Sequence, residues 1–382
     1  MTTAGYPVVV DGHTHIFNRV YWEHIDPWQP QPFGFDFARA FASGVNVIVE
    51  DLGSYGYVNF GQAPKQTLRL AETAHRYIEQ HADRMALALT SDDIRAIVAS
   101  GRLAVVLGVE SGFDHQGDLD VLRAFYRLGI RVIQFATQTC FNAFADAEID
   151  GPPHWNGINA RGRELVAEMN ALGVLIDITH ATPQAQAQLI EASAAPVVAS
   201  HVSLAAVSGT GLSDGNLRAL AAKGGLAGII GTSTGISSRY RDWMTAHPDT
   251  AKAAAAPVMT MVTCTSPQPA PAKDHGEFGT WFDGQMRANH LAVFRPWTEP
   301  AGAGPLVPTA DEWAAQAEHV VRTVGPDHVG IGLDLVGGRS CVPADASGYP
   351  DLLQALGRSL PAETAAKVAG QNWLRVLGAV LG

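Results

Sequence analysis

The chain has few cysteines, no excess of basic residues and no long apolar run, and each shortage argues against a class of protein. Its three cysteines, Cys140, Cys264 and Cys341, are odd in number and far apart among 382 residues, so they predict no disulfide framework. The net charge is −11, from 26 basic and 37 acidic residues, and the chain has no Lys- or Arg-rich run. Nucleic acid and anionic membranes are therefore poor candidates for partners.

Targeting and membrane-spanning features are missing as well. The opening residues, MTTAGYPVVVDGHTH, have neither a basic n-region nor an apolar h-region. No stretch is both long and apolar enough to span a bilayer. We therefore expect a soluble, cytoplasmic protein, with export by another route left open. At 47% hydrophobic residues the chain can bury a large core, and its 39 glycines and 22 prolines are too dispersed to indicate disorder.

Short β-branched runs alternate with helical patterns along most of the chain. The candidate buried strands cover residues 7–11, 45–51, 103–110, 130–137, 174–179, 195–200, 225–231 and 329–334. Helical spacing of apolar residues fills most of the intervals, at 67–84, 91–101, 118–128, 161–172, 183–192, 214–222 and 312–324, with Ser91-Asp92-Asp93 as the expected cap of the second of these helices. This repetition predicts an α/β fold, a (β/α)8 barrel of the TIM type, formed as one domain over residues 1–382.

Residues 237–311 interrupt the alternation after the seventh strand. The segment passes from an Ala-rich to a Pro-rich stretch and carries five large aromatic residues, Trp243, Phe278, Trp281, Phe282 and Trp297. An insertion at this point lies on the active-site face of a barrel, where lids and specificity loops occur. We expect a packed cap or a subunit contact, and an inert surface excursion is the alternative.

Side chains that can bind metal follow five of the candidate strands. In Asp11-Gly12-His13-Thr14-His15 two histidines at i and i+2 on an extended backbone point to one face. Alone, such a pair could lie in a surface turn, and any other strand-end polar residue could be structural. Together they predict a metal site at the C-terminal rim of the barrel, built from His13, His15, Glu110, His180, His201 and Asp334.

Four imidazoles and two carboxylates exceed the three protein ligands of a usual catalytic zinc site. Two divalent ions bridged by a carboxylate and a hydroxide fit this number. We expect two Zn²⁺, with a single ion or another divalent metal as the alternatives. Paired ions lower the pKa of a bridging water towards about 7 and polarise a carbonyl. A nearby carboxylate can then move the proton from the attacking water to the leaving amine, and Asp334 is our candidate for that shuttle, with Glu110 as a second catalytic carboxylate.

The motifs resemble those of the membrane (renal) dipeptidase family of zinc peptidases, within the amidohydrolase superfamily. They appear in the family's order: DGHTH (11–15), GVESG (108–112), EMNALGVLIDITHA (168–181), PVVASHVS (196–203), DHVGIGLD (327–334) and GQNWLRV (370–376). The resemblance implies a (β/α)8 barrel with two zinc ions that hydrolyses dipeptides, often as a homodimer. It places His13, His15 and Asp334 on the first ion, Glu110 between the ions, and His180 and His201 on the second.

Several positions depart from the family pattern. The family's first motif is usually His-x-Asp, whereas this chain has His-x-His, which makes the site one negative charge poorer. Gln138 stands where the family has a substrate-contacting histidine, and Gly209-Thr210-Gly211 stands where it has a carboxylate-binding arginine. An aromatic hydroxyl after the seventh strand is replaced near Thr232, and the second acid of an Asp-x-Asp pair is replaced by Val336.

These replacements remove groups that hold the ends of a free dipeptide but keep the candidate ligands. A lost guanidinium clamp is worth about 1.5–3 kcal/mol. Arg239 or Arg241 could replace the cation, although the favoured interpretation is that both are surface arginines. We expect the substrate site to include Gln138, Asn142, Thr210, Thr232 and Arg239.

The sequence thus predicts a metal-dependent hydrolase of a small amide or dipeptide-like molecule, specialised rather than general. One alternative is a superfamily enzyme acting on another bond: a lactone or ester hydrolase, a deaminase or a metal-dependent decarboxylase. A second is a non-enzymatic barrel, but a decayed site should have lost some of its ligands. The expected partners are a small-molecule substrate and a second copy of the chain.

Overall fold

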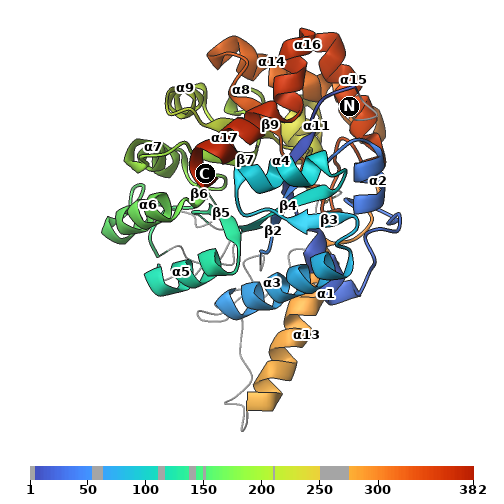
Figure 1. Cartoon of the computed structure of the whole chain (residues 1–382). Helices are drawn as coiled ribbons and strands as arrows, with labels where there is room; N and C mark the ends of the chain where they lie inside the picture. The colour runs from blue at the N-terminus through green and yellow to red at the C-terminus, as the bar shows by residue number, and fades with distance from the viewer. Residues whose placement is uncertain are drawn as a thin grey trace.

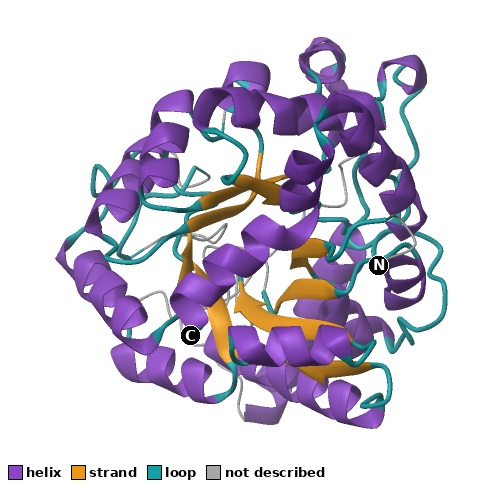
Figure 2. Ribbon diagram, turned by 45° about the horizontal axis from the view of Figure 1, so that its top comes forward, coloured by secondary structure: helices purple, strands orange, loops and turns teal. Residues whose placement is uncertain are grey.

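Eight parallel strands close into a barrel surrounded by helices in the computed structural model of the chain (Figures 1 and 2). The structure describes residues 5–53, 63–110, 117–136, 143–148, 152–209, 211–249 and 275–382. The barrel strands are β1 (Val10–Thr14), β2 (Val47–Asp51), β4 (Leu103–Val109), β5 (Ile130–Gln134), β6 (Leu175–Asp177), β7 (Val198–Val202), β8 (Leu226–Ile229) and β9 (Val329–Ile331). Pairing of β2 with β4 and of β1 with β9 closes the ring, so the predicted (β/α)8 architecture is confirmed.

A ninth strand, β3 (Met85–Leu87), was not expected from the sequence. It pairs with residues 103–105 of β4, while β5 pairs with residues 107–109 of the same strand. The two strands thus follow one another along one edge of β4. At three residues, β3 is too short to produce a recognisable pattern in the sequence.

Helices form the outer layer and cover the barrel. Those expected from the sequence are α3 (Ala63–Gln80), α4 (Ser91–Ala99), α5 (Leu119–Arg127), α6 (Ala160–Leu172), α7 (Pro183–Ala192), α9 (Asp214–Ala222) and α14 (Ala310–Val324). The sequence analysis did not predict α1 (Ile16–Glu23), α2 (Phe37–Ala42), α8 (Ala205–Ser208), α10 (Ser233–Ile236), α11 (Ser238–Ala246), α13 (His275–Val293), α15 (Tyr349–Ser359), α16 (Ala362–Ala366), the π-helix Lys367–Gln371 or α17 (Asn372–Leu381). No described helix combines the length and hydrophobicity that crossing a bilayer requires.

One helix cap differs from the prediction by a single residue. Thr90, rather than Ser91, is the N-cap of α4: its hydroxyl accepts a hydrogen bond from the Asp93 N–H, and the Asp93 carboxylate accepts one from the Thr90 N–H. This reciprocal pair satisfies two of the backbone donors that a helix start leaves open.

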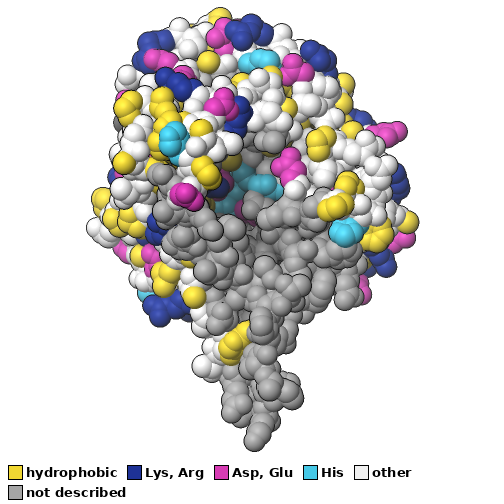
Figure 3. Space-filling view, turned by 180° about the vertical axis from the view of Figure 1, so that it is seen from behind, with side chains coloured by type: hydrophobic (Ala, Val, Ile, Leu, Met, Phe, Trp, Pro, Cys, Tyr) yellow, Lys and Arg dark blue, Asp and Glu magenta, His cyan; other side chains and the backbone are white. Residues whose placement is uncertain are grey.

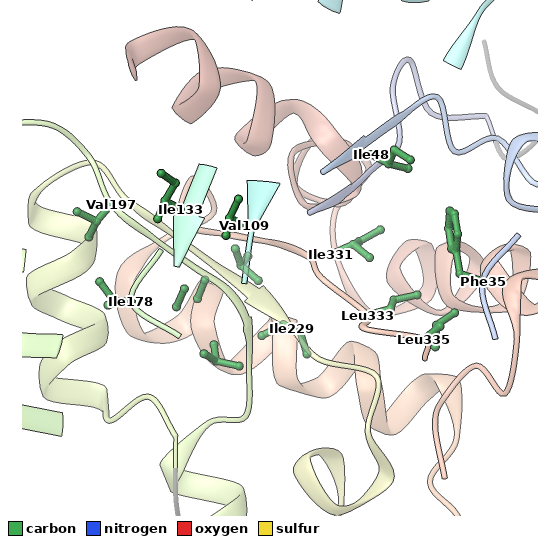
Figure 4. Packing of buried hydrophobic residues seen from close by; sticks show 14 of the residues in the cluster. Phe35, Ile48, Val109, Ile133, Ile178, Val197, Ile229, Ile331, Leu333 and Leu335 are labelled. Atoms are coloured by element: carbon green, nitrogen blue, oxygen red, sulfur yellow. The ribbon is translucent and has the colours of Figure 1, made fainter. Parts of the chain in front are cut away.

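Alternate residues of the strands feed two separate apolar clusters. In β4, Ala104 and Val106 point into the barrel, whereas Val105 and Leu107 pack towards the surrounding helices. This is the two-residue period of a strand buried on both faces. Figure 4 shows part of the outer cluster, including Ile48 of β2 and Ile133 of β5.

The C-terminal helix closes one end of the barrel interior. Trp373, Val376 and Leu377 of α17 belong to the interior cluster, and the Trp373 indole N–H donates to the carbonyl of Ile331. A Cβ on Gly12 would lie 1.8 Å from the Trp373 ring, so only glycine fits there. The GQNWLRV motif is thereby explained as a plug at the end of the barrel opposite the candidate ligands.

Residues of the expected insertion are described over 237–249 and 275–311. In Figure 1 the helix α13 extends beyond the body of the barrel. A hydrogen bond and an ion pair connect it to the helices beneath: His290 Nε2 lies 2.8 Å from the Glu23 carboxylate of α1, and Asp283 lies 2.6 Å from Arg69 of α3. The chain just after α13 approaches the loop that follows β9, since the Gly338 N–H donates to the Arg295 carbonyl.

Candidate metal centre

Six side chains from separate strand ends converge at the rim of the barrel. They belong to three overlapping groups whose candidate ligand atoms lie within 4.8 Å of one another: His13, His15 and Glu110; His13, His201 and Asp334; and Glu110, His180 and His201. Figure 3, which views the molecule from the side opposite Figure 1, shows histidine side chains at the bottom of a hollow with charged side chains around it. These six residues are called the ligand cluster below.

The two histidines of β1 and the turn after it direct their Nε2 atoms to one point. The Nε2 atoms of His13 and His15 are 2.7 Å apart and lie 3.3 and 2.9 Å from Oε2 of Glu110. Their side chains are 0% and 1% exposed. The shared face arises because residues i and i+2 of an extended segment point the same way.

Glu110 lies at the centre of the cluster, directly after β4. Its Oε2 faces His13 and His15, and its Oε1 lies 3.0 Å from His180 Nε2 and 3.7 Å from His201 Nε2. Burial raises the pKa of this carboxyl, but hydrogen bonds from His13, His15 and His180 together lower it by more than burial raises it. The pKa therefore lies well below its usual range. A carboxylate with one oxygen towards each histidine pair has the geometry of a bridging ligand.

His180 lies in the turn after β6, and His201 lies within β7. Their Nε2 atoms are 3.1 Å apart. His180 has φ 65, a left-handed conformation that costs a non-glycine residue of order 1–3 kcal/mol. Such strain is common where a side chain has to be aimed into a site.

Asp334, two residues beyond Gly332 at the end of the β9 segment, also adopts a left-handed backbone, with φ 56. Its Oδ1 lies 3.6 Å from His15 Nε2 and 4.0 Å from His13 Nε2. Burial raises the pKa of its carboxyl, but the positive charges of Arg339 and, to a smaller extent, of His201, His13 and His15 lower it by more. The net pKa is below its usual range. Asp334 is therefore ionised and held between the histidines and Arg339.

Asp51 at the end of β2 is part of the site but was not predicted. Its Oδ2 lies 2.8 Å from Nδ1 of His13, and its backbone carbonyl lies 3.2 Å from Nδ1 of His15. Both contacts engage Nδ1 and leave Nε2 facing the cluster. The sequence did carry a signal, because the second predicted strand ended in Glu50-Asp51, two acids after an apolar run.

Asp177 at the end of β6 has a similar role for His201. The Ser200 hydroxyl lies 2.9 Å from Nδ1 of His201 and donates to the Asp177 carboxylate. Asp177 also accepts from the N–H groups of Thr179 and Ser200. Carboxylates and hydroxyls placed behind ligating imidazoles fix their orientation and tautomer.

The donor set fits divalent metal ions. Imidazole nitrogen and carboxylate oxygen are the ligands that zinc and related ions take in catalytic sites, and all four Nε2 atoms face the shared carboxylate. Burial lowers the pKa of His201 well below its usual range, and so does the neighbouring charge on His13. A neutral imidazole at this position is the form that binds metal.

The expected substrate residues are only partly described. Gln138, Asn142 and Thr210 lie outside the described residues. Thr232 precedes α10, is 8% exposed and forms an isolated bridge with Cys341.

The two arginines expected as replacement cations have partners at the surface. Arg239 is half exposed and pairs with Glu312 at 3.2 Å. Arg241 pairs with Asp242 and donates to the Val207 carbonyl. The ligand cluster contacts neither of them through an ion pair in the described part of the chain.

Glu148 was not singled out by the sequence analysis and lies at the rim. Its backbone N–H donates to the His180 carbonyl, and its carboxylate accepts from the Gly211 N–H. Residues 209–211 are the segment in which the family resemblance expected a carboxylate-binding arginine. A carboxylate therefore lies beside a segment that would otherwise carry a cation.

A comparison with protein families agrees with the site. The model of the membrane dipeptidase family (peptidase family M19) matches residues 6–381. The chain belongs to the membrane dipeptidase family. The resemblance inferred from the motifs is thereby confirmed.

Individual relatives of this dipeptidase-family chain are distant. It is similar to dipeptidase tcpJ of Claviceps purpurea, 26% identical over 316 residues, which are 82% of this chain and 59% of that protein. The chain thus spans about three fifths of that relative's length.

Solved structures support the fold. The probable dipeptidase PvdM from Pseudomonas aeruginosa has a TM-score of 0.73 at 19% identity, covering 98% of this chain and 95% of PvdM. A metallopeptidase from Rhodobacter sphaeroides, liganded with a phosphinate mimic of the dipeptide L-Ala-D-Ala, has a TM-score of 0.68 at 18% identity, covering 98% of this chain and 99% of that one.

Proposed function

We propose that the protein hydrolyses a small amide or dipeptide-like substrate at a site of two divalent ions, with Zn²⁺ as the favoured metal. The observation that carries this proposal is the convergence of four imidazole Nε2 atoms on the two oxygens of Glu110, beside Asp334. Bound divalent ions would supply an activated water near neutral pH and polarise the scissile carbonyl. His13, His15 and Asp334 would hold one ion, His180 and His201 the other, and Glu110 would bridge them.

Asp334 is the proposed proton carrier. Its carboxylate lies within the ligand cluster, and the left-handed backbone at Asp334 sets the direction of the side chain. In this role it takes a proton from the attacking water and returns it to the leaving amine nitrogen. The oxygens of Glu110 lie 2.9 and 3.0 Å from their nearest imidazole nitrogens, closer than those of Asp334, and its proposed part is that of a bridge.

The substrate is proposed to be specialised. Gly209-Thr210-Gly211 carries no cation, and the Glu148 carboxylate lies against Gly211. A free α-carboxylate approaching this segment would meet the Glu148 carboxyl, whose pKa burial raises, rather than a guanidinium. Gln138, Asn142, Thr210, Thr232 and Arg239 remain our predicted substrate contacts, and a cytoplasmic homodimer remains our expectation for the assembly.

The proposed role of residues 237–311 is that of a cap on the active-site face. The Arg295 carbonyl accepts from the Gly338 N–H, four residues beyond Asp334 in the chain, which supports this position. We keep one barrel domain over residues 1–382 as the proposed organisation.

The test is metal analysis combined with a substrate panel. Protein purified with Zn²⁺ should contain two ions per chain and should hydrolyse at least one member of a panel of dipeptides and N-acylated amino acids, with loss of activity on chelation and recovery on adding Zn²⁺. Lactones and aryl esters belong in the same panel. Turnover of lactones without any amide cleavage would replace this proposal by the alternative superfamily chemistry.

A further inference from the structure

Arg339 extends from the loop after β9 to the edge of the ligand cluster. Its Nη2 donates to the carboxylate of Asp334 and lies 3.2 Å from the Asp334 carbonyl. The side chain of Arg339 is 38% exposed, whereas that of Asp334 is 7% exposed. The guanidinium thus connects a buried ligand to the open side of the site.

Two consecutive glycines turn the chain so that Arg339 folds back on Asp334. Gly337 and Gly338 have φ 84 and φ 64, conformations that side chains with a Cβ rarely adopt. A Cβ on Gly338 would lie 2.3 Å from the Val293 carbonyl, and one on Gly337 would lie 2.5 Å from the Arg295 carbonyl. The turn is therefore packed tightly against the chain that follows α13.

Contacts on the far side of Arg339 hold the same loop. The Ser340 hydroxyl donates to the Glu299 carboxylate and lies 2.7 Å from the Ser233 hydroxyl of α10. Glu299 also accepts from the Tyr240 hydroxyl of α11 at 2.8 Å. These hydrogen bonds fix the loop that carries Arg339 to α10 and α11.

The charges around the cluster make Arg339 distinctive. Of the arginines and lysines in the described part of the chain, Arg339 alone forms an ion pair with a member of the ligand cluster. His15 stands where the family usually has a carboxylate, so the site has lost a negative charge, and Arg339 adds a positive one at the Asp334 side. At the other side, beside His180, Glu148 contributes a carboxylate.

We propose that Arg339 is a specificity-determining residue that binds an anionic group, a carboxylate, of the substrate. A guanidinium carries five N–H donors in one plane, so it can hold Asp334 along one edge and a substrate carboxylate along another. The preferred substrate then carries its negative charge on the Asp334 side of the scissile bond and not against Glu148. The inference rests on the proposed function for the identity of the substrate, but the anion site itself can be tested without turnover.

Binding of a matched pair of probes tests the anion site. N-acetyl-L-alanine and N-acetyl-L-alaninamide differ by one carboxylate, and isothermal titration measures both with the Zn²⁺-loaded full chain. We expect the acid to bind more tightly than the amide, and Arg339→Gln to weaken binding of the acid about tenfold to a hundredfold while leaving the amide unchanged, as loss of a charge-assisted pair requires. Arg339→Lys should retain part of the preference.

Two further variants separate the alternatives. Arg322→Gln removes an exposed arginine paired with Glu318 on α14 and is the control. Arg239→Gln tests the cation expected from the sequence. If Arg239→Gln rather than Arg339→Gln abolishes the preference, or if Arg339→Gln weakens both probes equally, the inference is wrong.

Turnover gives an independent reading. The pairs Ala-Glu and Ala-Gln, and Ala-Ala and its C-terminal amide, should each show a preference for the more anionic member that Arg339→Gln removes through KM. If the protein binds the acid through Arg339 but hydrolyses no member of either pair or of the wider amide panel, the anion site stands and the proposed function falls. Hydrolysis of acid and neutral members at equal kcat/KM in wild type and Arg339→Gln would overturn the anion site and leave the hydrolase.

Discussion

At the scale of single residues, the site depends on side chains behind the ligands as much as on the ligands. Asp51 fixes His13, and Ser200 with Asp177 fixes His201, in each case through Nδ1. The sequence placed all six members of the ligand cluster at strand ends, because parallel strands meet at one rim. It could not reveal the contacts of Asp51 with His13 and of Asp177 with Ser200, which join residues of different strands.

The Asp51 contact leads to a prediction about metal affinity. Asp51→Asn keeps the shape of the side chain but removes the negative charge that polarises His13. We expect the affinity for Zn²⁺ to fall about 10- to 100-fold, the usual effect of altering such a partner. Competition with a chelating dye measures it. Asp26→Asn, which alters a carboxylate bonded to Tyr77 outside the site, should leave zinc affinity unchanged. Equal affinities in wild type and Asp51→Asn would remove Asp51 from the metal centre.

Asp334→Asn separates proton transfer from ligation. Asparagine retains a metal-binding oxygen but has no basic site. If Asp334 carries the proton, kcat on the best substrate should fall by roughly 10²–10⁴ while the metal content is retained. Parallel loss of metal and activity would show instead that Asp334 is mainly a ligand, and a near-normal kcat would assign the base elsewhere.

At the scale of elements, the sequence predicted the barrel strands and seven of the helices, and the reasons for the failures are physical. The strands were recognisable because they are buried on both faces and read as continuous apolar runs. The short helices after β1 and β8 were missed because four to eight residues give little periodicity. The sequence showed residues 370–376 only as a family motif. Their packing into the end of the barrel depends on Gly12 and Gly330, which are distant in sequence and leave room for the Trp373 ring.

The contact between α13 and α1 should depend on pH. Burial raises the pKa of Glu23, but hydrogen bonds from His290 and Arg19 together lower it by more than burial raises it. The net pKa is therefore below its usual value. A carboxyl with a lowered folded-state pKa stabilises the fold above its unfolded pKa of about 4.3, and this contribution is lost as the pH falls through the folded-state value.

Glu23→Gln should therefore be less stable than wild type at pH 7, and the difference should shrink as the pH is lowered below about 4. Urea unfolding at a series of pH values measures the two free energies. The facing groups are Arg19 on the same helix and His290 on α13, with Arg287 nearby. A stability difference that is constant with pH would show that Glu23 contributes through packing rather than charge.

At the scale of the whole molecule, the family's barrel carries an arginine and a glutamate at two edges of the ligand cluster. The fold and family follow from the sequence motifs, whereas the charge pattern around the cluster, with Arg339 at Asp334 and Glu148 at Gly211, became visible only when the loops were placed together. No spacing in the sequence connects residue 148 with residue 211.

The altered charges predict weak activity on ordinary dipeptides. With no cation at residues 209–211, Gly-Leu should be hydrolysed with kcat/KM below about 10⁴ M⁻¹s⁻¹, the lower end of the usual enzymatic range. Steady-state assays with the Zn²⁺-loaded protein measure this value, with an N-acylated amino acid as the comparison substrate. Efficient turnover of Gly-Leu would refute the specialised-substrate account.

Metal stoichiometry tests the central claim most directly. Plasma mass spectrometry should find two divalent ions per chain in the wild type and about one fewer in His180→Ala and in His201→Ala, with most hydrolytic activity lost in both. His319→Ala, which alters a histidine paired with Asp214 on the outer helices, should match the wild type in metal and activity. Unchanged metal content in both His180→Ala and His201→Ala would contradict the assignment of the ligand cluster as the catalytic metal centre.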